Sequence, residues 1–226
     1  CCCRNSERAT LAGMVHTMRM IVALLLALGL GSLPAQADVR DWNFRVLLDG
    51  REIGTHRFTL TAEGAQREVI TSQAQFKVRV LFFDAYSYRH EAREIWQDGC
   101  LRSLNAATVT NGRAENVKAE AREGSMVVAR EHASEEHKGC VMSFAYWNPA
   151  ILATRKLLNS QTGELMPVSV LSRGAESVRV RGQNVLADRY RIDGPELHID
   201  LWYAGQDWVA LEAPAAGGRQ LRYELL

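Results

Sequence analysis

The chain has 226 residues, and its 27 lysines and arginines against 26 aspartates and glutamates give a formal net charge of +1. This balance excludes the broad basic surface of a nucleic-acid-binding protein and the polybasic patch that anionic lipids attract. Hydrophobic residues make up 47% of the sequence, which is enough for a buried core.

Residues 18–37 predict a cleavable signal peptide. Arg19 supplies the positive start, residues 20–30 form an apolar run, and Ala35-Gln36-Ala37 is a small-residue cleavage site. The run is shorter than the ~20 residues that a membrane helix needs. We therefore expect cleavage after Ala37, a periplasmic or secreted protein, and no transmembrane segment in the mature chain. Residues 1–17 are expected to be an upstream extension outside the native protein.

Residues 38–226 are expected to form a single β domain. Gly-containing turn signals such as Asp49-Gly50 and Asn111-Gly112 favour positive φ, and they separate runs in which apolar and polar residues alternate. The predicted strands are 42–49, 52–63, 66–80, 85–97, 100–110, 113–122, 125–131, 164–172, 176–192 with a break, 196–204, 207–213 and 219–225. Long strands joined by short hairpins favour an antiparallel meander that forms a curved sheet, a sandwich or a partly open barrel.

One short helix is predicted over residues 149–158, packed on the sheet or across a barrel mouth. Asn148 is a good N-cap, and Pro149 is a good first helical residue. Ile151, Leu157 and Leu158 would then share an apolar face. A helix of this length is marginal alone, so it must pack against the sheet.

Cys100 and Cys140 are the cysteines that remain after cleavage, and they predict a disulfide in an exported protein. The alternative is a pair of buried free thiols. The bridge would fix the position of the segment that leads into the predicted helix.

No catalytic, metal-binding or cofactor motif is present. The segment from His132 to His137 is one residue too long for an inverted zinc-protease motif and is expected to be a solvated acidic loop. A hydrolase site assembled in space would need His56, His90 or His198 close to a serine and a carboxylate. We therefore predict no catalytic residue, no metal and no cofactor.

Aromatic residues beside the helix start are the best candidates for binding a ligand. Tyr146, Trp147 and Asn148 could hold an apolar or anionic molecule near the free N–H groups of the helix. Tyr88 and His90 share one face of a strand and are added to this candidate site. The alternative is that the rings only fill the open end of the fold.

Three motifs resemble a known family: WNFRVLLDGREIGTHRF, the central FAYWNP with LLNSQTGEL, and IDLWYAGQDWVALEA with the closing LRYEL. They are similar to a group of exported bacterial proteins known as domain of unknown function 6134, which looks related to domain of unknown function 3108. The resemblance implies export and a mainly β fold. It carries no catalytic residues.

The sequence thus favours a non-enzymatic exported β protein that binds an apolar or lipid-like molecule. The alternatives are a structural or interaction protein of the cell envelope with an envelope protein as partner, and a hydrolase. Nucleic acid is not expected as a partner.

Overall fold

Thirteen strands form one antiparallel sheet in the computed structural model, which describes residues 38–80 and 83–226. The strands of this sheet are β1 (Val39–Leu48), β2 (Arg51–Ala62), β3 (Arg67–Val80), β4 (Phe83–Gln97), β5 (Cys100–Thr110), β6 (Arg113–Arg122), β7 (Ser125–Arg130), β8 (Ala133–Lys138), β11 (Ser169–Val180), β12 (Gln183–Gly194), β13 (Leu197–Ala204), β14 (Asp207–Ala215) and β15 (Arg219–Leu225). Two further strands, β9 (Lys156–Leu158) and β10 (Leu165–Pro167), form a small separate sheet. The predicted mainly β, antiparallel fold is confirmed.

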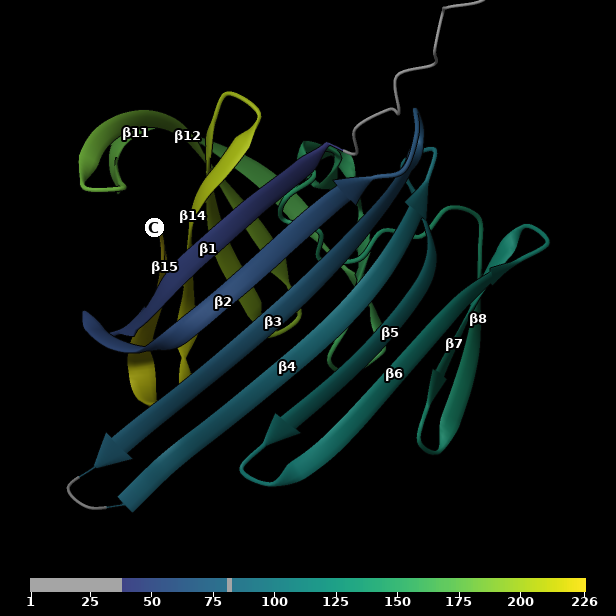
Figure 1. Cartoon of the computed structure of the whole chain (residues 1–226), viewed down its shortest axis with the longest axis horizontal. Helices are drawn as coiled ribbons and strands as arrows, with labels where there is room; N and C mark the ends of the chain where they lie inside the picture. Colours follow the sequence, from purple (N-terminus) through teal and green to yellow (C-terminus); the bar gives the residue numbers. More distant parts are fainter. Residues whose placement is uncertain (1–37, 81–82) are drawn as a thin grey trace, which may run out of the picture. The chain divides into compact units, whose positions relative to one another are not determined.

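The strands follow the chain as two meanders that meet in the middle of the sheet. The order runs from β11 through β15, continues from β1 and ends at β8, so that the last strand pairs with the first. The sheet curls on itself, with β1 to β6 forming one wall and β12 to β15 facing them (Figure 1). Within the described residues, β8 and β11 do not pair with each other, so the sheet stays an open curl instead of closing into a barrel. A sandwich, one of the predicted alternatives, is not formed.

The alternation of residue types explains the two faces of each strand. On β3, Ile70, Ala74 and Phe76 are buried on the inner face, while Gln73 and Gln75 point outward and are exposed. Hairpin turns carry the expected signals, as at Asn111 (φ 50°) and Gly112 (φ 84°), whose positive φ values match the twist of the flanking strands. The sequence pattern alone therefore sets most strand boundaries.

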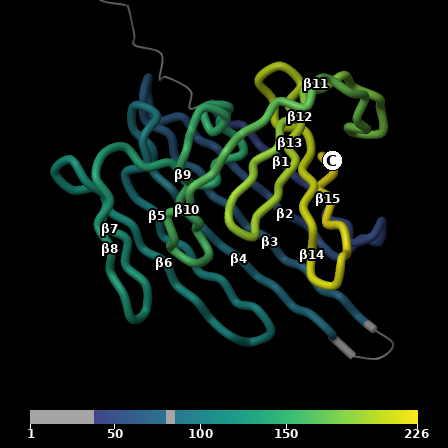
Figure 2. The backbone as a smooth tube through the Cα atoms, turned by 180° about the vertical axis from the view of Figure 1, so that it is seen from behind, coloured from purple at the N-terminus to yellow at the C-terminus, as the bar shows by residue number. Residues whose placement is uncertain are grey.

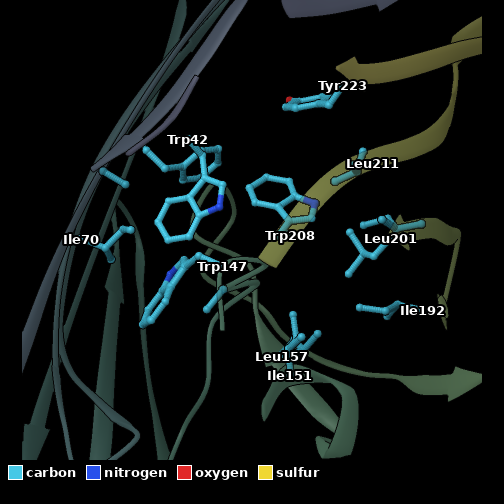
Figure 3. Close-up of a cluster of buried hydrophobic side chains, with 14 of the residues drawn as sticks. Trp42, Ile70, Trp147, Ile151, Leu157, Ile192, Leu201, Trp208, Leu211 and Tyr223 are labelled. Atoms are coloured by element: carbon cyan, nitrogen blue, oxygen red, sulfur yellow. The ribbon is translucent and has the colours of Figure 1, made fainter. Parts of the chain in front are cut away.

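The core fills the inside of the curl. Trp96, Trp208 and Phe44 are fully buried, and the rings of Phe44 and Trp208 lie 4.3 Å apart between their centroids. Figure 3 shows the side chains that gather between the two walls of the sheet, among them Trp42, Ile70, Trp147, Leu201, Trp208 and Leu211.

Residues 139–168 cross the inside of the curl between β8 and β11 (Figure 2). The prediction of a helix over 149–158 within this segment is wrong. Asn148 does cap a helix and accepts a hydrogen bond from the Ala150 N–H at 3.0 Å, but this helix is a 3₁₀ turn, η1, over Pro149–Ala153. Leu157 and Leu158 are buried in β9 instead. Leu158 donates its N–H to Met142 O (2.8 Å) and accepts from Phe144 N (3.2 Å). These non-local hydrogen bonds outweigh the weak preference for so short a helix.

The predicted disulfide between Cys100 and Cys140 is confirmed. It joins the start of β5 to the start of the inner segment. Beside it, the Leu101 N–H donates to Val141 O at 3.1 Å. The bridge therefore fixes the inner segment to the wall of the sheet.

Two further predictions are corrected by the pairing. The acidic loop predicted after His132 forms edge strand β8, whose side chains are mostly exposed as expected. The turn predicted between strands 164–172 and 176–192 is a β-bulge at Gly174 within β11 (φ 85°), whereas the break predicted within 176–192 is the turn at Arg181-Gly182. The proposed extension (1–17) and signal peptide (18–37) lie outside the described residues. No helix in the described part of the chain is long and apolar enough to span a membrane.

Candidate functional site

A cavity of about 240 Å³ lies inside the curl. β2, β3 and β4 line it on one side, and β13, β14 and β15 line it on the other. Residues 144–147 and the β9–β10 turn at 159–161 complete the lining. Much of the lining is apolar, with Phe58, Ile70, Phe144, Leu197, Ile199, Leu211 and Leu221 among its members.

Small residues on the inner face leave this space open. Ser72, Ala92 and Ala106 lie opposite one another on β3, β4 and β5. Ala74 occupies the next row, between His56 on β2 and His90 on β4. Because the neighbouring rows hold short side chains, the rings around them enclose a void.

His56 links two strands that are distant in the sequence. One ring nitrogen, Nε2, lies 2.7 Å from Ser72 Oγ, and the other, Nδ1, lies 3.2 Å from the Tyr223 hydroxyl. Its ring stacks on Phe58 with centroids 4.0 Å apart. Burial, with a smaller effect from His90, lowers the pKa of His56 to about 3, so its imidazole is neutral at physiological pH.

His90 is a second buried imidazole on the cavity wall. Its Nδ1 lies 2.9 Å from Thr108 Oγ1, and its Nε2 has no hydrogen-bond partner within the part of the chain that is described. Burial lowers the pKa of His90 to about 4. It therefore presents a neutral polar nitrogen in a largely apolar space.

Glu94 is a buried carboxyl group at the other end of the same face of β4. Its Oε2 accepts from Trp96 Nε1 at 2.8 Å and from Ser143 Oγ at 3.0 Å. Burial raises the pKa of Glu94 to about 7, although both hydrogen bonds act in the opposite direction. The group thus carries a proton for much of the time near neutral pH.

Four of the five predicted binding residues line the cavity, namely Tyr88, His90, Tyr146 and Trp147. Tyr88 stacks on Phe76 with centroids 5.1 Å apart, and Trp147 packs edge-on against Trp96 at 5.5 Å. Asn148 is not among the lining residues, because its side chain caps η1.

Sequence reasoning missed several polar residues of the cavity, among them Ser72, Glu94 and Tyr223. Glu94 had a usable signal, since it lies in register with Tyr88 and His90 on the inner face of β4. Ser72 had the same kind of signal, because it alternates with outward-facing residues between Ile70 and Ala74 on β3. Tyr223 had none, because only the pairing of β15 with β1 brings it to His56.

The arrangement does not favour acyl transfer. His56 contacts a serine, but its second nitrogen faces Tyr223 where a triad would have a carboxylate. An imidazole with such a low pKa is a weak base near pH 7. His198 pairs with Asp193 at an exposed site away from the cavity. Within the described residues, no group of three potential metal ligands is found.

A family model described as domain of unknown function DUF6134 matches residues 44–226, which confirms the resemblance predicted from the three motifs. The further relation to domain 3108 stays a prediction. The fold is similar to the crystal structure of a beta-barrel-like protein of domain of unknown function DUF1849 from Brucella abortus. That likeness has a TM-score of 0.59 and 12% identity, and covers 82% of this chain and 94% of that chain. It concerns the fold alone. None of the curated proteins matches the chain.

Proposed function

The chain belongs to the family of domain of unknown function DUF6134, and we propose that this member is a non-enzymatic protein that binds a small apolar, lipid-like ligand inside its curled sheet. The observation that carries the proposal is the cavity between β2–β4 and β13–β15. Its lining combines aliphatic and aromatic side chains with a few polar atoms, which is the usual composition of a ligand pocket.

The size of the cavity limits the ligand. A volume of about 240 Å³ exceeds the roughly 150 Å³ of an engineered apolar cavity that binds benzene. It is just below the roughly 300 Å³ at which pockets for larger ligands begin. The cavity therefore suits a molecule with about one medium-length alkyl chain, or one end of a longer lipid.

The side-chain chemistry supports binding over catalysis. The two imidazoles are neutral and weakly basic, and no lysine or arginine is found among the described residues that line the cavity. Glu94, the one acidic residue among the described lining residues, carries a proton for much of the time near neutral pH. An interior with so little charge lowers the cost of transferring an apolar molecule into it.

Export to the periplasm or the cell exterior is part of the proposal. The disulfide supports it, because such bridges persist mainly in oxidising compartments. The sequence of residues 18–37 supports it as well. N-terminal sequencing of the protein purified from its native cells should begin at Asp38, and a chain that retains residues 18–37 would contradict export by cleavage.

A cavity-filling variant tests the binding function. In Ala92→Leu the new side chain would occupy the cavity floor, while Ala107→Leu adds the same group to the exposed outer face of the adjacent strand. We expect 1-octanol to bind the wild-type protein and Ala107→Leu with similar affinity in titration calorimetry, and to bind Ala92→Leu at least about tenfold more weakly, as when a pocket is filled. Equal affinity for all three proteins would refute binding in this cavity.

A second candidate function is an interaction with an envelope protein through edge strand β11. This edge has 12 residues and exposes Leu171, whereas the opposite edge, β8, is short and charged, which discourages pairing. In Leu171→Lys, a partner recovered by cross-linking in intact cells should be lost while octanol binding persists. Recovery of the same partner by both proteins would count against this role.

A further inference from the structure

The two oxygens of the Glu94 carboxyl group differ in their surroundings. Oε2 accepts two hydrogen bonds, from Trp96 Nε1 and from Ser143 Oγ. Oε1 has no hydrogen-bond partner within residues 38–80 and 83–226, although Glu94 is 8% exposed and lines the cavity. Oε1 is therefore the oxygen of this carboxyl group that remains available to a molecule in the cavity.

The position of the proton follows from these bonds. Trp96 Nε1 can only donate, and Ser143 donates to the same oxygen, so Oε2 is already occupied as an acceptor. When Glu94 is protonated, its hydrogen therefore lies on Oε1. The group then presents a single O–H donor for which the described residues supply no acceptor.

The side chains next to Glu94 on the inner face of the sheet are small or apolar and carry no charge. Ala92 precedes Glu94 by two residues on the same face of β4, and its neighbours across the sheet, Ser72 and Ala106, are also small. Ile70 and Leu104 flank Glu94 itself on β3 and β5. His90 is four residues away, about 13 Å along the strand, so it cannot neutralise the carboxyl group directly.

The titratable side chains on the surrounding elements are His56 on β2, Glu68 on β3, Tyr88 and His90 on β4, Tyr146 of the inner segment and Tyr223 on β15. The two histidines remain neutral above pH 5, and burial raises the pKa values of the three tyrosines. Glu68 does not line the cavity. Among the described residues that line the cavity, Glu94 is the one whose pKa, about 7, lies between pH 5.5 and 8.5.

We propose that the ligand carries a carbonyl oxygen, as in a fatty-acyl ester or amide, which accepts a hydrogen bond from the protonated carboxyl group of Glu94. This inference rests on the proposed binding function and names the head group that the site recognises. The alkyl chain would lie along Ile199, Leu211 and Leu221, which line the opposite wall. The raised pKa of Glu94, about 7, supports it, because the donor is then present in neutral solution.

The test compares methyl octanoate with n-octane, which lacks the carbonyl group. The ratio of their dissociation constants cancels the general cost of covering Glu94 with an alkyl chain. In the wild-type protein we expect the preference for the ester to fall at least about fivefold between pH 5.5 and 8.5, which is the worth of one hydrogen bond. An unchanged ratio overturns the inference and leaves the binding function intact, whereas failure of both ligands to bind refutes the binding function itself.

Glu94→Gln provides the matched variant. Its amide oxygen can accept from Trp96 and Ser143, and its NH₂ group then replaces the O–H donor at every pH. The preference of this variant for the ester should be independent of pH, and a fall like that of the wild type would overturn the inference. If this variant does not fold, the carbon NMR shift of carbonyl-labelled methyl octanoate decides. On wild-type protein it should move downfield at pH 5.5 relative to pH 8.5, and identical shifts would contradict the hydrogen bond.

Discussion

Removal of the Cys100–Cys140 disulfide gives a prediction whose magnitude follows from the structure. The bridge closes a loop with a sequence separation of 40 residues. In the chain-entropy treatment, opening such a loop lowers the free energy of unfolding by about 4 kcal/mol at 25 °C. Cys140 is exposed and Cys100 is partly exposed, so replacement by serine adds little desolvation cost.

Urea unfolding of Cys100→Ser, Cys140→Ser and the double variant measures this loss. Either substitution alone already removes the disulfide. Each single variant and the double variant should therefore lose the same free energy of unfolding, about 4 kcal/mol. Wild-type protein that is reduced and alkylated should match them. A loss below about 1 kcal/mol, or a double variant that loses the sum of the two singles, would refute the reasoning.

Further predictions concern pH and strand packing. Burial raises the pKa of Glu94 from 4.5 to about 7, so between these pH values the folded protein binds more protons than the unfolded chain, and stability falls as the pH rises. In urea unfolding at pH 8, Glu94→Gln should therefore be about 3 kcal/mol more stable than the wild type. Equal stability of the two proteins would contradict a buried, protonated carboxyl group. His56 and His90 show the opposite sign, since the unfolded chain takes up protons below about pH 6.5 while the folded rings stay neutral. Stability should therefore fall on acidification towards pH 4, and His56→Asn or His90→Asn should each flatten that fall in urea unfolding at several pH values; an unchanged slope would argue against neutral buried rings. In Gly54→Ala the new Cβ would lie 1.9 Å from the backbone oxygen of Gln75, so thermal unfolding should reveal a loss of about 3 kcal/mol, and wild-type stability would show that β2 and β3 do not approach so closely.

The strands could be predicted because their signals are local. Alternation and paired turn residues, as at Asn111-Gly112, depend on a few neighbouring residues. The same signals misled where glycine had another role, since Gly174 marks a bulge inside β11 and not a turn. The helix predicted at 149–158 failed for a non-local reason, because Leu158 forms hydrogen bonds with Met142 and Phe144, and because its strand β9 pairs with β10.

The candidate site was predictable only in part. Tyr146 and Trp147 were predicted because two aromatic side chains directly before the helix-start signal Asn148-Pro149 are easily recognised in a sequence. The polar residues of the cavity come from strands that meet through long-range pairing, as when β15 joins β1 and places Tyr223 beside His56. The open curl, with β8 and β11 as its two edges, also depends on the pairing of the whole sheet.

A crystal structure with 8-bromo-1-octanol tests the binding of an apolar molecule inside the curl most directly, because bromine is located by its anomalous scattering. The wild-type protein should show a bromine peak among Trp147, Ile199 and Leu211, which line the cavity, and crystals of Ala92→Leu should not. Bromine found only on the outer surface, or in the same place in both proteins, would contradict ligand binding in this cavity.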